Sequence, residues 1–183
     1  MNAALAVVAL VLAANAPRRR SALSTDDTVT VAFGGLLAAL LFVALAAVAS
    51  PLTDALDISR PNLRIAAGVV LAVVSMHDLV WRRPRPGAAL PGRGAALVPV
   101  FFPVLARPEI GLLAMSVGAD HGVLFTALAA GLSMAVVVGW HALATPREEQ
   151  PVFARVEGGA ARVDAALALA AAVAVTADGV FAI

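Results

Sequence analysis

Cysteine and lysine are absent from this sequence, and charged residues of any kind are few. Without cysteine, disulfides, thiol nucleophiles and cysteine-ligated metals are excluded. All 13 basic residues are arginine, and together with abundant alanine this indicates a GC-rich coding bias rather than a particular chemistry. Charged residues make up 14% of the chain, against about 25% in a typical soluble domain. The net charge of +1 gives no sign of the clustered basic face that a nucleic-acid partner requires.

Apolar residues are correspondingly abundant in the sequence. They make up 61% of the chain, and the mean hydropathy is +0.92, whereas a soluble domain averages about 45–50% apolar residues. Much of a small domain's chain must remain at its surface, so this excess cannot be hidden in one core. We therefore predict an integral membrane protein in contact with membrane lipids.

Long apolar stretches predict helices that cross the membrane. Each crossing needs roughly 20 apolar residues, because a helix rises about 1.5 Å per residue through about 30 Å of hydrocarbon. The sequence offers six such windows, at residues 2–16, 29–49, 63–81, 95–117, 123–144 and 163–183. Turn-forming residues separate the windows, as at Ser50-Pro51 and Thr145-Pro146. Apolar and polar residues do not alternate in runs such as 36–48, as they would in the strands of a membrane barrel. The expected fold is all-α: one membrane domain over residues 1–183 with six transmembrane helices.

The distribution of arginine predicts how these helices are threaded. Arginines concentrate after the first and third windows and before the last. They are Arg18, Arg19 and Arg20; Arg82, Arg83, Arg85 and Arg93; and Arg147, Arg155 and Arg162. On the opposite side, Asp54 and Asp57 balance Arg60 and Arg64. The arginine-rich segments are expected in cytoplasmic loops, where runs 18–20 and 82–85 also meet anionic lipid heads, and both termini are expected outside.

The first window is short, and Ala14-Asn15-Ala16 resembles a signal-peptidase site. No basic residue precedes it, however, and Pro17 directly after the site is a poor cleavage context. We therefore expect the first window to be retained as a helix.

The sequence contains an internal repeat. Segments 64–78 and 162–178 each begin with arginine, continue as an alanine-rich apolar stretch, and reach an acid, Asp78 or Asp178. The first and fourth windows each carry a proline, Pro17 and Pro108, and both pairs are offset by roughly 90–100 residues. Units of three helices must insert in opposite orientations, because three is odd, and such inverted repeats are common in secondary transporters. We predict repeats at about 1–82 and 95–183, joined by a loop at about 83–94.

Several motifs resemble those of one family. The segment Val98-Pro99-Val100-Phe101-Phe102-Pro103-Val104-Leu105-Ala106-Arg107-Pro108-Glu109 resembles the V-P-L-A-x-P-L-x-A-G-P-G signature of MarC-type integral membrane proteins. Residues 57–68 are similar to the segment before that family's third helix, Asn15-Ala16-Pro17 to its N-P-x-G element, and Asp178-Gly179 to its closing D-G. The resemblance implies a six-helix protein of the bacterial plasma membrane, grouped with LysE-like transporters, with no firmly assigned substrate.

The chain departs from the family pattern at its glycines. Arg107 and Glu109 stand where the signature has glycine, and Arg18 follows Pro17 where the first element ends in glycine. Glycines that let a backbone approach a ligand are thus replaced by charged side chains. The resemblance is therefore to a divergent member, whose substrate need not be that of the main family.

Arg107 and Glu109 are the most informative candidate site residues. Arg107 lies about 18 Å into the fourth window at helical rise, close to mid-membrane, where a charge is normally paired or faces water. Pro108 removes a backbone donor and disfavours helix at Arg107, so a broken helix is expected there. A broken helix near the midplane offers free backbone groups beside a cation and an anion, as at a binding point or gate. The alternative is that the pair marks the solvated end of a shorter helix.

Other polar and small residues have more than one interpretation. Asn15 either belongs to the solute path or bonds a neighbouring helix. Asp78 and Asp178 lie near helix ends and are either path residues or hydrated carboxylates. The His77-Asp78 and Asp120-His121 pairs are predicted on opposite membrane sides, so they cannot share a metal; His141 could join His77 in a small cluster. Small residues indicate close helix packing: Gly34, Gly35, Gly68, Gly118, Gly122 and Gly131.

These observations predict a small-solute carrier or exporter rather than an enzyme, with no cofactor and no metal. The expected solute path includes Asn15, Pro17, Pro103, Arg107, Pro108 and Glu109. Two alternatives remain: a non-transporting partner of another membrane complex, and an intramembrane enzyme built on the scattered histidines. No hydrolase elbow, phosphate-cradling loop or His-x-x-x-His pair occurs in the sequence.

Overall fold

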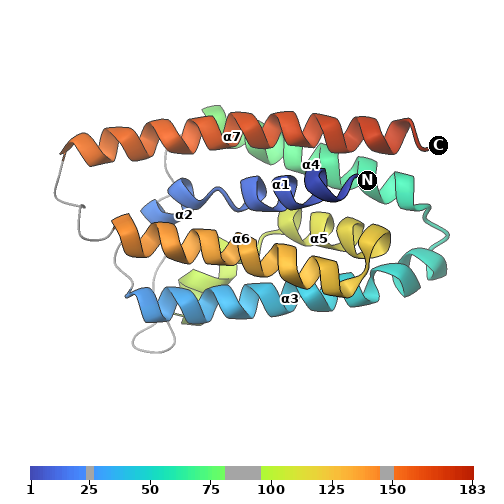
Figure 1. Ribbon diagram of the computed structural model, residues 1–183, viewed down its shortest axis with the longest axis horizontal. Helices are drawn as coiled ribbons and strands as arrows, with labels where there is room; N and C mark the ends of the chain where they lie inside the picture. Colours follow the sequence, from blue (N-terminus) through green and yellow to red (C-terminus); the bar gives the residue numbers. More distant parts are fainter. Residues whose placement is uncertain (24–26, 81–95, 145–150) are drawn as a thin grey trace.

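The protein, seen here as a computed structural model, is a bundle of long helices (Figure 1). The structure describes residues 1–23, 27–80, 96–144 and 151–183, and the regular elements within them are all helical. The elements are α1 (Ala3–Ala14), α2 (Ala16–Ala22), α3 (Thr28–Ala55), α4 (Arg60–Val80), η2 (Leu97–Leu105), α5 (Pro108–His121), α6 (Val123–Ala144) and α7 (Pro151–Val180). The predicted all-α fold is confirmed for these residues.

Helices α1 and α5 lie in the middle of the bundle, between the pair α4–α7 and the pair α3–α6 (Figure 1). α1 packs against α5, α6 and α7, and its alanine-rich sequence lets them approach closely. The main core cluster joins α1 residues such as Leu10 to Phe42 of α3, Leu71 of α4 and Leu113 of α5. The core is therefore centred on the short helices, and the long helices surround it.

Four helices of the described chain are long and apolar enough to cross a membrane: α3, α4, α6 and, over Arg155–Val180, α7. The prediction of six such helices is thus confirmed for four. Windows 2–16 and 95–117 are interrupted, the first after Ala14 and the second after Leu105. α1, with 12 residues, and α5, with 14, are each shorter than the roughly 20 residues that one crossing needs.

The outer surfaces of the long helices are apolar. Large exposed side chains recur at helical spacing, for example Phe33, Leu36 and Leu40 on α3 and Leu124, Leu128 and Leu132 on α6. In water such continuous apolar faces would favour aggregation, whereas lipid tails solvate them. The four long helices and these faces are compatible with a membrane protein.

Two predicted helix boundaries are wrong. The expected break at Ser50-Pro51 is absent, because α3 continues through Pro51 to Ala55. The hydroxyl of Thr53 donates to the carbonyl oxygens of Ala49 (3.0 Å) and Ser50 (2.9 Å), in the turn that contains the proline. The last helix begins at Pro151 rather than near residue 163. Arg155 and Arg162, predicted in a loop, therefore lie within α7.

The bundle has two distinct ends (Figure 1). One end carries both chain termini, the turn from α3 to α4 and the turn from α5 to α6. The opposite end carries α2, the beginnings of α3 and α7, and the ends of α4 and α6. The loop arginines Arg82, Arg83, Arg85, Arg93 and Arg147, on which the threading prediction also depends, lie outside the described residues.

Glycine permits the closest helix contacts, as predicted, at several positions. A Cβ added to Gly68 of α4 would lie 2.8 Å from the backbone nitrogen of Thr176 in α7, and one added to Gly118 of α5 would lie 2.7 Å from the Cα of Ala46 in α3. A Cβ added to Gly34 or Gly35 would also contact neighbouring side chains, whereas one added to Gly122 or Gly131 would have nothing within 4 Å. The predicted role in close packing is thus wrong for the last two.

Candidate functional site: a buried ion-pair cluster at two helix breaks

The first helix break is at Asn15. This residue adopts a left-handed conformation (φ 42°, ψ 62°), which asparagine tolerates better than most residues. Its backbone N–H donates to the carbonyl of Leu12 (3.0 Å) and ends α1, while its side-chain oxygen accepts from the amide of Arg18 (3.3 Å) and begins α2. Pro17, which has no N–H, could not continue the α1 hydrogen-bond pattern. The sequence Asn15-Ala16-Pro17 therefore produces a sharp break between two helices.

The second break is at Ala106 and Arg107. Arg107 is extended (φ −104°, ψ 146°), as a residue before proline prefers to be, and Pro108 opens α5 at a position that needs no N–H. The amide of Arg107 donates to the carbonyl of Leu105 (3.0 Å), which closes a tight turn at Ala106. The preceding η2 is kinked, with extended residues at Val98 and Phe102. The break that Pro108 predicts is thus present, and Arg107 and Glu109 flank it.

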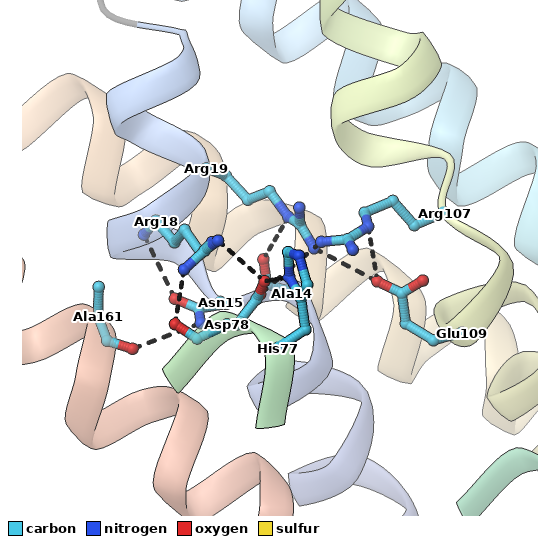
Figure 2. A network of polar contacts seen from close by, with 9 residues as sticks. All are labelled: Ala14, Asn15, Arg18, Arg19, His77, Asp78, Arg107, Glu109 and Ala161. Carbon is cyan, nitrogen blue, oxygen red and sulfur yellow. Dashed lines mark hydrogen bonds and ion pairs between the residues drawn. The ribbon is translucent and has the colours of Figure 1, made fainter. Parts of the chain in front are cut away.

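Arg19 connects the two breaks (Figure 2). Its Nε donates to the carbonyl of Ala14 (3.0 Å), the last residue of α1, and its Nη2 lies 3.6 Å from Oε1 of Glu109. A cation is favourable at a helix C-terminus and an anion at an N-terminus. Arg19 and Glu109 therefore each complement the helix end beside which they lie, and both are buried.

Asp78 of α4 completes the cluster. Arg18 contacts it twice, through Nη1 to the Asp78 carbonyl (2.6 Å) and through Nη2 to the carboxylate (3.1 Å). Arg107 lies 3.8 Å from the other carboxylate oxygen of Asp78 and 2.7 Å from Glu109. We call Arg18, Arg19, Asp78, Arg107 and Glu109 the break-point cluster. It draws charged side chains from α2, α4 and the start of α5 into one buried site (Figure 2).

The prediction that Arg18, Arg19 and Arg20 form a cytoplasmic loop beside lipid heads is wrong. All three lie in α2, and Arg19 and Arg20 are buried. Nη1 of Arg20 contacts both carboxylate oxygens of Glu157 in α7 at 3.2 Å. Buried arginines need carboxylate partners, and distant segments provide them here.

The predicted site residues divide into two groups. Asn15, Pro17 and Glu109 are buried and Arg107 is partly buried, and Nδ2 of Asn15 donates to the carbonyl of Ala161 in α7 (3.4 Å). The pair thus stands at the start of the short helix α5, with Glu109 inside the bundle and Arg107 22% exposed. The other group is Pro103 and Pro108, whose rings are exposed. Pro108 shapes the break without contributing to its polar lining, and Pro103, joined to Phe102 by a cis peptide bond, lies within η2.

A second ion-pair cluster lies at the end of the bundle that carries the termini. Arg64 of α4 contacts Asp120 of α5 with Nε (2.8 Å) and Nη2 (2.9 Å), and contacts Asp178 of α7 with Nη1 (2.7 Å). The amino group of Met1 lies within 3.4 Å of Asp120 and 3.3 Å of Asp178. We call Arg64, Asp120 and Asp178 the terminal cluster. Arg64 is therefore neutralised by acids of α5 and α7.

The three histidines lie on three different helices, α4, α5 and α6. His77 is at the end of α4, largely exposed, with its Nδ1 3.4 Å from Asp78. His141 is buried in α6, and His121 ends α5 and stacks against Phe125 (ring centroids 4.8 Å apart). Within the described ranges, no three His, Asp or Glu side chains are grouped so that they could hold a metal ion.

Sequence reasoning missed Arg18, Arg19 and Arg64 as interior residues. An arginine run after a short apolar window is typical of a cytoplasmic loop, and that interpretation concealed the α2 helix. One signal pointed the other way: Asn15 and Pro17 form an N-cap and first turn directly before the arginines. A helix that begins at this point places the three arginines against the bundle.

Comparisons of the chain with protein-family models, with curated proteins and with solved structures gave no match. The resemblance to MarC-type proteins therefore stays a prediction that depends on the motifs alone.

Proposed function

We propose that the chain is a small-solute carrier or exporter, a divergent MarC-type protein of a bacterial plasma membrane. The observation that carries this proposal is the meeting of two helix breaks at the buried break-point cluster. Irregular backbone at membrane depth is tolerated where it is buried in protein or lines a polar path. Broken helices that face charged groups are also the usual construction of solute sites in secondary transporters.

The proposal includes six crossings. In it, α1 with α2 makes one broken crossing and η2 with α5 makes another, beside the four long helices. Two facts support this. The segments 3–22 and 97–121 are each about as long as one crossing requires, and both extend along the bundle (Figure 1).

The proposal also includes two inverted repeats. The third helices of the two halves, α4 and α7, pack against each other, as do the second helices, α3 and α6. Each half begins with its broken segment, and α1 also packs against α5. Packing between equivalent helices of the two halves is compatible with a two-fold relation between them.

In the proposed orientation, the end with α2 faces the cytoplasm and both termini lie outside. The arginine bias of the sequence supports this threading. The buried residues Arg19 and Arg20 no longer count toward the bias, since they are paired with acids inside the bundle.

Transport through the break-point cluster can be tested with reconstituted vesicles. Vesicles containing the purified chain would be loaded with labelled acetate, phosphate, lysine or potassium, and efflux compared with that of empty vesicles. We expect at least one solute to leave faster with the parent protein. Arg107→Ala and Glu109→Ala should lower that flux at least tenfold, because each removes a charged group from the path. Arg162→Ala, at an exposed position of α7, is the matched control.

The experiment separates the protein's function from its site. If no solute leaves faster than from empty vesicles over a broad panel, the carrier function is wrong. If the parent conducts a solute and both cluster variants conduct it equally well, the chain transports but the path lies elsewhere.

A further inference from the structure

The break-point cluster contains more positive than negative groups. Three guanidinium groups, from Arg18, Arg19 and Arg107, face two carboxylates, from Asp78 and Glu109. The neighbouring Arg20 and Glu157 form a pair of their own. Side-chain exposure is 6% for Arg19 and 1% for Glu109, so water gives little compensation. An uncompensated positive charge inside a membrane protein is costly and favours an anionic partner.

Hydrogen-bonding capacity within the cluster is also unused. Nη2 of Arg19 is buried without a hydrogen-bond partner, and its nearest carboxylate oxygen is 3.6 Å away. Neither oxygen of Glu109 accepts a hydrogen bond from the described residues, although Oε1 lies 2.7 Å from Nε of Arg107. Buried polar atoms of native proteins are nearly always paired. The unpaired atoms of Arg19 and Glu109 face each other across the gap between the two helix breaks (Figure 2).

The N-terminus of α5 opens beside this gap. No side chain caps it, and Pro108 supplies no N–H at its first position. The uncapped end of a helix carries a partial positive charge and free amides that bind anions. Glu109 in the first turn occupies this position as the chain's own anion. It is held by contacts with Arg107 and Arg19 that lack hydrogen-bond geometry, so an incoming anion can replace it.

We propose that the solute of this protein is a small anion, a carboxylate or an inorganic oxyanion, which binds Arg19 and Arg107 in place of the Glu109 side chain. This inference rests on the proposed carrier function and specifies its substrate class. Arginine suits the role because its planar fork matches carboxylate and oxyanion geometry. The two carboxylates of the cluster, Asp78 and Glu109, already face arginines, which disfavours a cationic solute.

Asp164 of α7 brings a further acid to the site. Its Oδ2 is buried without a hydrogen-bond partner in the described structure, and Arg19 is the charged group that acts on it. This carboxylate competes with an incoming anion for Arg19, so replacing it with asparagine should strengthen anion binding.

Other charged groups on the elements that pack against α7 have partners or positions elsewhere. α7 packs against α1, α2 and α4. Near the break-point cluster, Arg18 and Asp78 pair with each other, His77 contacts Asp78, and Arg20 pairs with Glu157. At the end of the bundle that carries the termini, Arg64 belongs to the terminal cluster and the Met1 amino group contacts Asp178. Arg60 begins α4 at the same end.

The test uses the full chain in lipid nanodiscs, with acetate, phosphate, lysine and choline as separate probes at constant ionic strength. Affinity would be measured by thermal shift and by titration calorimetry. We expect acetate or phosphate to bind and lysine and choline not to bind. The acetate and phosphate arms distinguish a carboxylate solute from an inorganic one.

The variants separate binding from folding. Arg19→Gln should weaken anion binding at least tenfold, and Arg19→Lys should restore part of it. Glu109→Gln should instead tighten binding, because the competing carboxylate is removed while every arginine remains; this variant keeps the test decisive if Arg19→Gln does not fold. Asp164→Asn should bind the anion more tightly than the parent. Arg162→Gln is the control.

Three results would overturn the inference. Binding of lysine or choline, with no binding of acetate or phosphate, would contradict an anionic solute but not the carrier function. Equal anion affinity in the parent, Arg19→Gln and Glu109→Gln would show a general salt effect. If no probe binds and no solute leaves the vesicles faster than from empty ones, both the anion proposal and the carrier function are wrong.

Discussion

The two ion-pair clusters use the same residue types and differ in how well those residues are satisfied. In the terminal cluster, one arginine meets two carboxylates from continuous helices, with contacts of 2.7–2.9 Å that all count as hydrogen bonds. In the break-point cluster, three arginines meet two carboxylates beside interrupted helices, and two of the contacts reach 3.6 and 3.8 Å. A satisfied cluster holds helices together, whereas an unsatisfied one leaves capacity for a ligand.

The largest expected effect on stability is in the terminal cluster. Arg64→Gln leaves Asp120 and Asp178 without their guanidinium partner, and only the longer contacts with the Met1 amino group remain, at 3.4 and 3.3 Å. We expect a loss of about 3 kcal/mol, on the order seen when one partner of a buried ion pair is removed, with a smaller share from Asp178 because its side chain is 35% exposed. Thermal or denaturant unfolding in detergent measures it. Arg64→Lys should recover only part, since the two bonds to Asp120 need a planar fork. If Arg64→Gln is as stable as the parent, the terminal cluster does not hold the helices together and the contrast between the two clusters is wrong.

The second-largest loss of stability is expected where two helices pack closely. Gly68→Ala places a Cβ within 2.9 Å of the Ala172 carbonyl oxygen, so α4 and α7 must separate beside the terminal cluster. We expect a loss of about 1–3 kcal/mol, typical of overpacked cores. Gly131→Ala, with nothing within 4 Å, should match or exceed the parent in the same unfolding assay. Equal behaviour of the two variants would mean that the ion pairs alone hold these helices together.

At the break itself, stability should change less than activity. Asn15→Ala forces an ordinary residue into the left-handed conformation, at about 1–2 kcal/mol, and removes the cap of α2. Asn15→Gly keeps the conformation and should cost only a few tenths of a kcal/mol. Comparing unfolding with vesicle flux separates backbone from side chain: if Asn15→Gly retains stability and loses flux, the amide contributes to the path. A loss of stability in Asn15→Gly as large as in Asn15→Ala would contradict this interpretation of the break.

The smallest effect is expected outside both clusters, at Asp27. Its carboxylate accepts from the amide of Thr30 (2.6 Å) and caps α3, and this hydrogen bond lowers the pKa of Asp27 below its ordinary value. A lowered pKa means that the stabilisation is present above about pH 4 and is lost as the pH falls through the folded-state value. Asp27→Ala should therefore unfold at a slightly lower temperature than the parent at pH 7. The difference should shrink in acid, and an unchanged difference at low pH would exclude the cap as its source.

Periodicity and composition were enough for the long helices. Continuous apolar runs of the right length admit no competing structure in lipid, so window 123–144 coincides with α6 and window 29–49 lies within α3. The break at Arg107 was also predictable, because proline acts locally through its missing N–H and its effect on the preceding residue. Helix ends were less predictable: α3 continues past Pro51 to Ala55, and the apolar pattern does not show whether a proline ends a helix or lies within it.

The sequence alone determined that this chain has more apolar surface than a small globule can bury, and where proline interrupts its helices, because both follow from local composition. Only the tertiary structure decided which charges meet. Arg19 and Glu109 are 90 residues apart in the chain and Arg64 and Asp178 are 114 apart, and no local rule pairs them. A buried guanidinium must find a carboxylate wherever the packing of the helices brings one, so the partners depend on the whole bundle.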